Sequence, residues 1–197
     1  MTVDQQPLAQ FVDRDTMRYE RRYPHPVERV FDAVSTAEHL EAWMLPVTRV
    51  ERRVGGRCSF TWGSPEEDFA QVGEVTEFDP PHAITYTFAE PTGSMRFLLT
   101  PDGDGTVLHF TLHWPVPDDK PLEPEDYPGG DLPAGPGTAW RPGFLAGFHD
   151  FLDDLSLFLD GEWTKDDRLA FIAGDPMPEE ELIARYREHV STNCPAR

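Results

Sequence analysis

The chain has 197 residues, of which 36 are acidic and 17 are basic, so its net charge is −19 when the histidines are neutral. A field of this sign repels phosphate backbones and anionic lipid, and we therefore expect neither a nucleic-acid nor a membrane partner. The length suits one domain with a well-buried core.

Secretion and membrane insertion are not indicated either. No apolar run has membrane-spanning length, and the N-terminus MTVDQQPLAQ lacks the basic start and the apolar core of a signal peptide. We therefore expect a cytoplasmic protein. Cys58 and Cys194 lie far apart and are interpreted as free thiols. Lys120 and Lys165 are the only lysines, and such a preference for arginine is typical of a GC-rich bacterial genome.

The first part of the chain predicts an arm, a strand and two short helices. Residues 1–15 are polar and are expected to form an N-terminal arm, and residues 17–23 alternate as a strand does. A second helix is expected from Ala37 to Trp43. The first helix is indicated by apolar residues at helical spacing, which are Val27, Val30, Phe31 and Val34.

From residue 47 to residue 114 the hydrophobic period changes to two, which predicts about six antiparallel strands. Together with the strand at 17–23 they make a sheet of about seven strands, and Gly/Pro/Asp clusters supply the turns. The alternation predicts one apolar, aromatic face, whose members are Cys58, Phe60, Trp62, Ile84, Tyr86, Phe88, Met95, Phe97, Leu99, Leu108, Phe110, Leu112 and Trp114.

Residues 115–143 interrupt this pattern, because they are rich in proline and glycine and poor in aliphatic residues. A loop of this length inside a compact domain is usually either a functional lid or disordered. We interpret it as an insertion loop.

Residues 144–160 predict a long amphipathic helix that ends at Gly161. Its apolar arc is wide, which indicates that a concave surface wraps it. His149, Asp153, Ser156 and Asp160 fall on the opposite side. The arc itself contains Phe144, Phe148, Phe151, Leu152, Leu155, Phe158 and Leu159.

Residues 162–197 predict a C-terminal extension with one more helix. Pro178 and the acidic residues after it suit a first helical turn, and Leu182, Tyr186 and Val190 follow at four-residue steps. We expect this extension to dock either on the domain itself or on a second copy of the chain, as a homodimer.

Several short motifs follow one another in the order and spacing of a known family. They are PVERVFDA at 26–33 with Leu40 and Trp43, GEV at 73–75, FDPP at 78–81, Gly105-Thr106, and Gly147-Phe148 with Phe151, Leu152, Leu155, Leu159 and Gly161. With these motifs, residues 16–161 resemble the SRPBCC superfamily of START and birch-pollen-allergen-like proteins. The resemblance is to the branch of activator-of-heat-shock-protein-ATPase homologues.

The resemblance implies an α+β helix-grip fold, in which a bent antiparallel sheet wraps around the long helix with a cavity between them. The domain would then span residues 16–161, with 115–143 as an insertion and 162–197 as an extension. The functions implied are a small-molecule-binding protein, an enzyme of the cyclase or hydrolase type, or a co-chaperone-like stimulator of a heat-shock ATPase. We favour the binding protein and leave open whether the protein is an enzyme.

Aromatic side chains would line such a cavity and would select an apolar or aromatic small molecule. The alternative is that these rings simply fill the core. The candidate ligand-binding residues are Trp43, Phe60, Trp62, Tyr86, Phe88, Phe97, Phe110, Phe144 and Phe148.

Catalytic and metal-binding signals are weak. Glu74 lies on a predicted strand and would suit general acid–base chemistry if it pointed inward, although an exposed carboxylate is the more common case. His109 and His113 would lie ~13 Å apart on a strand, too far to share an ion. We expect no metal site and no cofactor.

Overall fold

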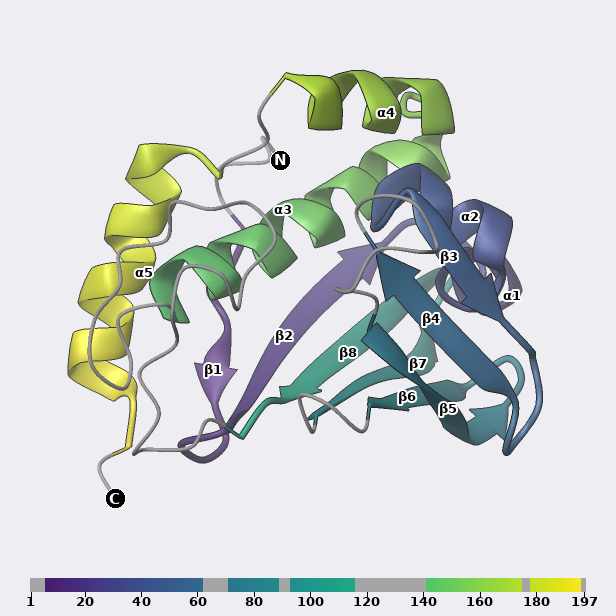
Figure 1. Ribbon diagram of the computed structural model, residues 1–197, viewed down its shortest axis with the longest axis horizontal. Helices are drawn as coiled ribbons and strands as arrows, with labels where there is room; N and C mark the ends of the chain where they lie inside the picture. Colours follow the sequence, from purple (N-terminus) through teal and green to yellow (C-terminus); the bar gives the residue numbers. More distant parts are fainter. Residues whose placement is uncertain (1–5, 62–70, 89–92, 116–140, 175–177, 196–197) are drawn as a thin grey trace.

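The computed structural model describes residues 6–61, 71–88, 93–115, 141–174 and 178–195. These residues form an α+β fold of eight strands and five helices (Figure 1). The strands are β1 (Gln10–Phe11), β2 (Thr16–Tyr23), β3 (Val47–Val50), β4 (Arg57–Thr61), β5 (Gln71–Asp79), β6 (Ala83–Phe88), β7 (Gly93–Asp102) and β8 (Gly105–His113). The helices are α1 (Val27–Ser35), α2 (Ala37–Trp43), α3 (Arg141–Asp160), α4 (Lys165–Ala173) and α5 (Glu180–Asn193).

All eight strands form one antiparallel sheet in the order β1-β2-β8-β7-β6-β5-β4-β3. The sheet curves around one side of α3, and α4 and α5 lie on the other side of that helix (Figure 1). The predicted helix-grip architecture is therefore confirmed. The sheet has one strand more than the expected seven, because part of the N-terminal arm pairs with β2 as the two-residue strand β1.

The period-two pattern places the expected side chains on the face toward α3. The predicted members of this face that the structure describes are all buried. Register explains why they meet: Phe97 of β7 pairs with Phe110 of β8, which in turn pairs with Tyr19 of β2. Trp62 lies outside the described residues.

The two short helices close one end of the sheet. Trp43 at the end of α2 is 1% exposed, and its indole N–H donates to the Ala33 carbonyl at 2.9 Å. The Tyr86 hydroxyl donates to the Val34 carbonyl at 2.9 Å. These two bonds satisfy buried polar tips on otherwise apolar side chains, and they tie α1 to both α2 and the sheet.

Helix α3 begins at Arg141, three residues before its predicted start, so the end of the expected insertion loop is helical. Its last residue is Asp160, and Gly161 has a φ of +79°, a conformation that glycine adopts without strain. None of the described helices combines the length and the apolar character needed to span a bilayer.

The C-terminal extension contains two helices where one was predicted. Helix α4 was not predicted from the sequence, because it buries Arg168 and has no buried apolar stripe. A capping box, in which Thr164 and Asp167 exchange side-chain and backbone hydrogen bonds, starts this helix. Helix α5 packs on α3 through Tyr186 and Val190. The extension therefore docks on its own domain, and the homodimer stays a prediction.

Candidate functional site

Eight of the nine aromatic residues proposed from the sequence lie in the described part of the chain, and their rings contact one another. The contacts form a closed circuit, with centroid separations of 4.6 Å to 6.2 Å, in which Trp114 supplies the joining ring. Trp43 attaches to this circuit edge-on, 6.3 Å from Phe97. We call the circuit the aromatic cluster; its members in order are Phe97, Tyr86, Phe60, Phe88, Trp114, Phe144, Phe148 and Phe110.

The strands place two aliphatic side chains between these rings. Met95 pairs with Tyr86 on one side and with Leu112 on the other, and both Met95 and Leu112 are buried. Gly93 has a separate role, because a Cβ there would lie 2.6 Å from the Trp114 ring. A residue without a side chain therefore lets Trp114 lie over the start of β7.

The helix side of the cluster is its most accessible part. Phe144 and Phe148 are only partly buried, whereas the sheet-borne rings Phe60, Phe88, Phe97 and Phe110 are at most 1% exposed. Both partly buried rings come from the N-terminal half of α3, and they contact each other at 5.0 Å with a T-shaped geometry. An apolar guest could reach the cluster here with the least disruption of the core.

The titratable groups that β4 to β7 direct toward α3 are few in the described residues. Burial raises the pKa of the Tyr86 hydroxyl well above its usual value, and it raises the pKa of the Cys58 thiol to about 12. Both groups therefore stay protonated at neutral pH. This side of the cluster offers a neutral apolar surface rather than an acid–base pair.

Glu74, the candidate general acid or base, lies on the other face of the sheet. It is exposed on β5 opposite Arg57, while the next residue, Val75, points into the core. It therefore lies apart from the aromatic cluster. Within the described ranges, no group of three His, Cys, Asp or Glu side chains is placed to hold a metal ion.

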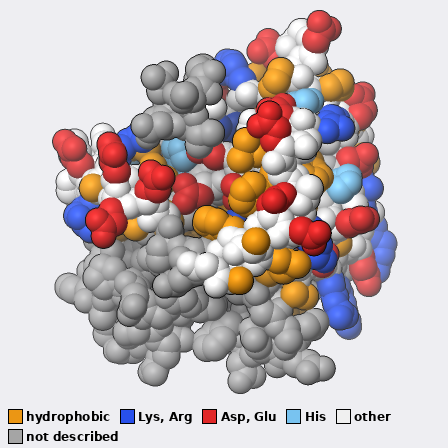
Figure 2. All heavy atoms as spheres, turned by 90° about the horizontal axis from the view of Figure 1, so that it is seen from above, with side chains coloured by type: hydrophobic (Ala, Val, Ile, Leu, Met, Phe, Trp, Pro, Cys, Tyr) orange, Lys and Arg blue, Asp and Glu red, His pale blue; other side chains and the backbone are white. Residues whose placement is uncertain are grey.

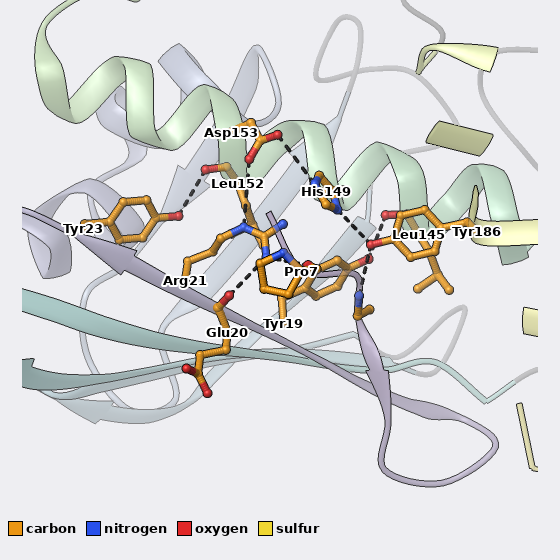
Figure 3. Close-up of polar contacts among 11 residues, drawn as sticks. Pro7, Tyr19, Glu20, Arg21, Tyr23, Leu145, His149, Leu152, Asp153 and Tyr186 are labelled. Carbon is orange, nitrogen blue, oxygen red and sulfur yellow. Dashed lines mark hydrogen bonds and ion pairs between the residues drawn. The ribbon is translucent and has the colours of Figure 1, made fainter. Parts of the chain in front are cut away.

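A second cluster, made of polar side chains, lies between α3, strand β2 and helix α5 (Figure 3). The Arg21 guanidinium is 2% exposed and lies 3.9 Å from the Asp153 carboxylate, whose other oxygen is 3.6 Å from Nε2 of His149. Nδ1 of His149 lies 3.0 Å from the Tyr186 hydroxyl of α5. We call these four residues the polar network.

Hydrogen-bond partners assign the protons of this network. Tyr186 accepts the backbone N–H of Ala9, and Tyr19 gives its hydroxyl hydrogen to the Leu145 carbonyl. The Tyr186 hydrogen can therefore point to Nδ1 of His149, which leaves Nε2–H directed at Asp153. Burial, followed by the charge of Arg21, lowers the pKa of His149 to about 3, so the ring is neutral.

Three aspartates on this side of α3 have raised pKa values. Burial raises the pKa of Asp150 and of Asp153 to about 7, and nearby carboxylates add to the effect. Asp154 is ion-paired with the buried Arg168 of α4 at 2.7 Å. The outer side of α3 therefore carries partly desolvated charge where the sequence suggests a plain polar face.

The outer surface offers two further features. A wide, open hollow of about 360 Å³ lies near the turn between β7 and β8 and is lined in part by Arg22, Asp102 and Asp104. Figure 2, which looks onto the helices, shows many acidic side chains with hydrophobic ones between them. Leu169 and Phe171 of α4 belong to the exposed hydrophobic residues. Neither feature brings together residues proposed from the sequence.

Sequence reasoning missed Trp114 as a site residue and missed the whole polar network. Trp114 could have been found, because its alternation already placed it on the apolar face. Arg21 also had a signal, since Met17, Tyr19, Arg21 and Tyr23 share one face of β2. His149 and Tyr186 had none, because only the docking of α5 brings them together.

The fold and this site define a helix-grip protein, with a curved sheet and a long helix enclosing an aromatic core. The family model described as "Activator of Hsp90 ATPase homolog 1-like protein" matches residues 24–127, which is more than half of the chain. The chain therefore belongs to this family. No curated protein matches the sequence.

Solved structures with the same fold are distant in sequence. A conserved protein of unknown function from Enterococcus faecalis is 17% identical, with a TM-score of 0.61, and the match covers 98% of this chain and 94% of that one. A protein from Bacillus halodurans is 20% identical, with a TM-score of 0.59 and coverage of 78% and 99%. CalU16 from Micromonospora echinospora is 16% identical, with a TM-score of 0.56 and coverage of 90% and 88%. These likenesses show the fold.

Proposed function

We propose that this protein binds an apolar or aromatic small molecule at the aromatic cluster, between the sheet and the N-terminal half of α3. The observation that carries the proposal is the closed circuit of eight rings, of which Phe144 and Phe148 stay partly exposed. Ligand pockets in proteins typically combine such apolar, aromatic walls with few polar anchors.

The chemistry of the lining favours binding over catalysis. Its hydroxyl and thiol, on Tyr86 and Cys58, remain protonated, and the carboxylate of Glu74 is on the opposite face of the sheet. A flat aromatic guest could stack on Phe144 or Phe148 and displace their contacts with water, so desolvation would dominate its binding free energy.

The test is a titration of the whole chain with the dye ANS, followed by fluorescence and by calorimetry at several temperatures. We expect saturable binding with a negative heat-capacity change, which marks burial of apolar surface. Phe148→Ala should weaken binding about tenfold or more. Phe158→Ala is the matched control, because Phe158 is a partly buried ring of α3 that contacts His39 instead of the cluster.

Equal affinities of the two variants would contradict the proposed site. Native mass spectrometry of protein from its own host would then look for a retained compound and give its mass. Turnover of that compound by the purified protein would support the enzyme hypothesis in place of the binding protein.

A further inference from the structure

Both halves of α3 are hydrogen-bonded to strand β2, but the N-terminal half is also held by helix α5 of the C-terminal extension. In the C-terminal half, Arg29 of α1 donates to the Leu159 carbonyl at 2.6 Å, and Tyr23 of β2 donates to the Leu152 carbonyl at 3.1 Å. In the N-terminal half, Tyr19 of β2 donates to the Leu145 carbonyl at 2.7 Å. The N-terminal half, which carries Phe144 and Phe148, is covered in addition by α5, which is itself bonded to Ala9 of the N-terminal arm (Figure 1).

Four contacts fasten this cover. The Tyr186 hydroxyl joins α5 to His149 of α3 at 3.0 Å and to the backbone N–H of Ala9 at 3.1 Å. His189, one turn further along α5, donates from Nε2 to the Ala9 carbonyl at 2.7 Å. Arg141, the first residue of α3, reaches Sγ of Cys194 at 3.8 Å. Both backbone groups of Ala9 are thus bonded by side chains of α5.

We propose that α5 and Ala9 form an intramolecular clasp, which keeps the N-terminal half of α3 against the sheet and must loosen before a ligand enters the aromatic cluster. This inference rests on the proposed function. A guest that passes beyond the exposed edges of Phe144 and Phe148 into the cluster has to part this half of the helix from the sheet, and the clasp holds the helix from the other side.

The composition of the clasp suits a contact that opens. Helix α5 is held on the domain by a few hydrogen bonds and by two buried side chains, Tyr186 and Val190. The sheet side of α3, in contrast, is held by the continuous aromatic cluster. Beneath the clasp, Nε and Nη2 of Arg21 have no hydrogen-bond partner within the described residues. Regions with few buried apolar contacts open locally at lower cost than the core does.

Tyr186→Phe tests the clasp, because it keeps the ring and removes the hydroxyl that joins α5 to α3 and to Ala9. Tyr23→Phe is the matched control: it removes one hydroxyl bond to the same helix, at Leu152, without touching the clasp. Hydrogen exchange should become about tenfold faster at residues 141–149 in Tyr186→Phe. The control should change exchange there by less than about twofold.

Stopped-flow mixing with ANS supplies the second measurement. Tyr186→Phe should raise the association rate several-fold, while Tyr23→Phe leaves it unchanged. If Tyr186→Phe does not fold, His189→Ala removes the bond to the Ala9 carbonyl together with the ring contacts to Phe11 and Tyr186, keeps the Tyr186 hydroxyl, and should give changes in the same direction.

Unchanged exchange at 141–149 in the clasp variant would overturn the clasp. Faster exchange with an unchanged association rate would overturn its control of ligand entry. Absence of ANS binding by the unmodified protein would instead count against the proposed function, and exchange would still decide whether the clasp exists.

Discussion

The two sides of α3 are both buried, yet they are stabilised by different forces. Its sheet side packs Phe144 and Phe148 into a circuit of aromatic rings. Its outer side holds His149, Asp150 and Asp153, with Arg21 of β2 and Arg168 of α4 as counter-charges. Apolar burial is non-directional and tolerates adjustment, whereas a buried charge depends on one particular partner. We therefore expect the outer side to be more sensitive to single substitutions.

The largest effect should come from Arg168→Ala, which breaks the buried ion pair with Asp154. The guanidinium also donates to the Met44 carbonyl at 2.9 Å and lies over the Phe151 ring at 4.7 Å. Removing one partner leaves a buried charge uncompensated, so the free energy of unfolding should fall by about 3–5 kcal/mol. Urea denaturation measures the change, with the exposed Arg187→Ala as control. A loss similar to that of the control would show that α4 contributes little to the fold.

A smaller loss is expected on the sheet side from Phe148→Ala. Truncating a fully buried Phe costs ~3–5 kcal/mol, and a partly buried one should cost about 2 kcal/mol. The same denaturation experiment applies, with ANS affinity measured on the folded variant. A loss greater than that of Arg168→Ala would reverse the comparison between the two sides.

The pH dependence of the free energy of unfolding shows whether Asp150 acts through its protonation or through its packing. The pKa of Asp150 is raised from 3.8 to about 7 by burial and by Asp154, Asp153 and Glu179, against the lowering effect of Arg168. Between pH 3.8 and about 7 the folded protein holds a proton that the unfolded chain releases. The stabilising contribution of this group is therefore complete below pH 3.8, falls as pH rises through this interval, and is lost above pH 7.

Asp150→Asn mimics the protonated acid and should therefore stabilise the protein by about 1–2 kcal/mol at pH 8 and by about half as much at pH 5.5. The difference between variant and unmodified protein, measured at each pH, removes the opposing contribution of His149, whose pKa is lowered. A stabilisation of equal size at both pH values would point to packing instead of titration.

Glu74→Gln should have the smallest effect. The side chain is exposed on the face of the sheet that points away from the aromatic cluster, so stability should change by less than about 0.5 kcal/mol and ANS affinity should stay the same. Loss of turnover of an identified substrate in this variant, with binding intact, would establish an acid–base enzyme and overturn the placement of the site.

Much of the fold and of the sheet side of α3 could be predicted from the sequence. Alternation of polar and apolar residues on β4, β6, β7 and β8 selects one face, and that face can be buried only against the wide apolar arc of α3. Seven of the candidate aromatic residues, those on the strands and on α3, lie together for this reason. The family motifs at 26–33 and 78–81 added the helix-grip arrangement, which the family match now supports. The signal was strong because each local pattern pointed to the same core.

The outer side of α3 was decided only by the tertiary structure. His149 and Asp153 look like members of a solvated face, and Arg168 looks like an ordinary surface arginine. They become buried because α4 and α5 fold back onto α3 and bring Arg168 to Asp154 and Tyr186 to His149. No local periodicity encodes contacts between residues 14 and 37 positions apart, since hydrogen bonds and ion pairs form only after the apolar packing has placed their partners.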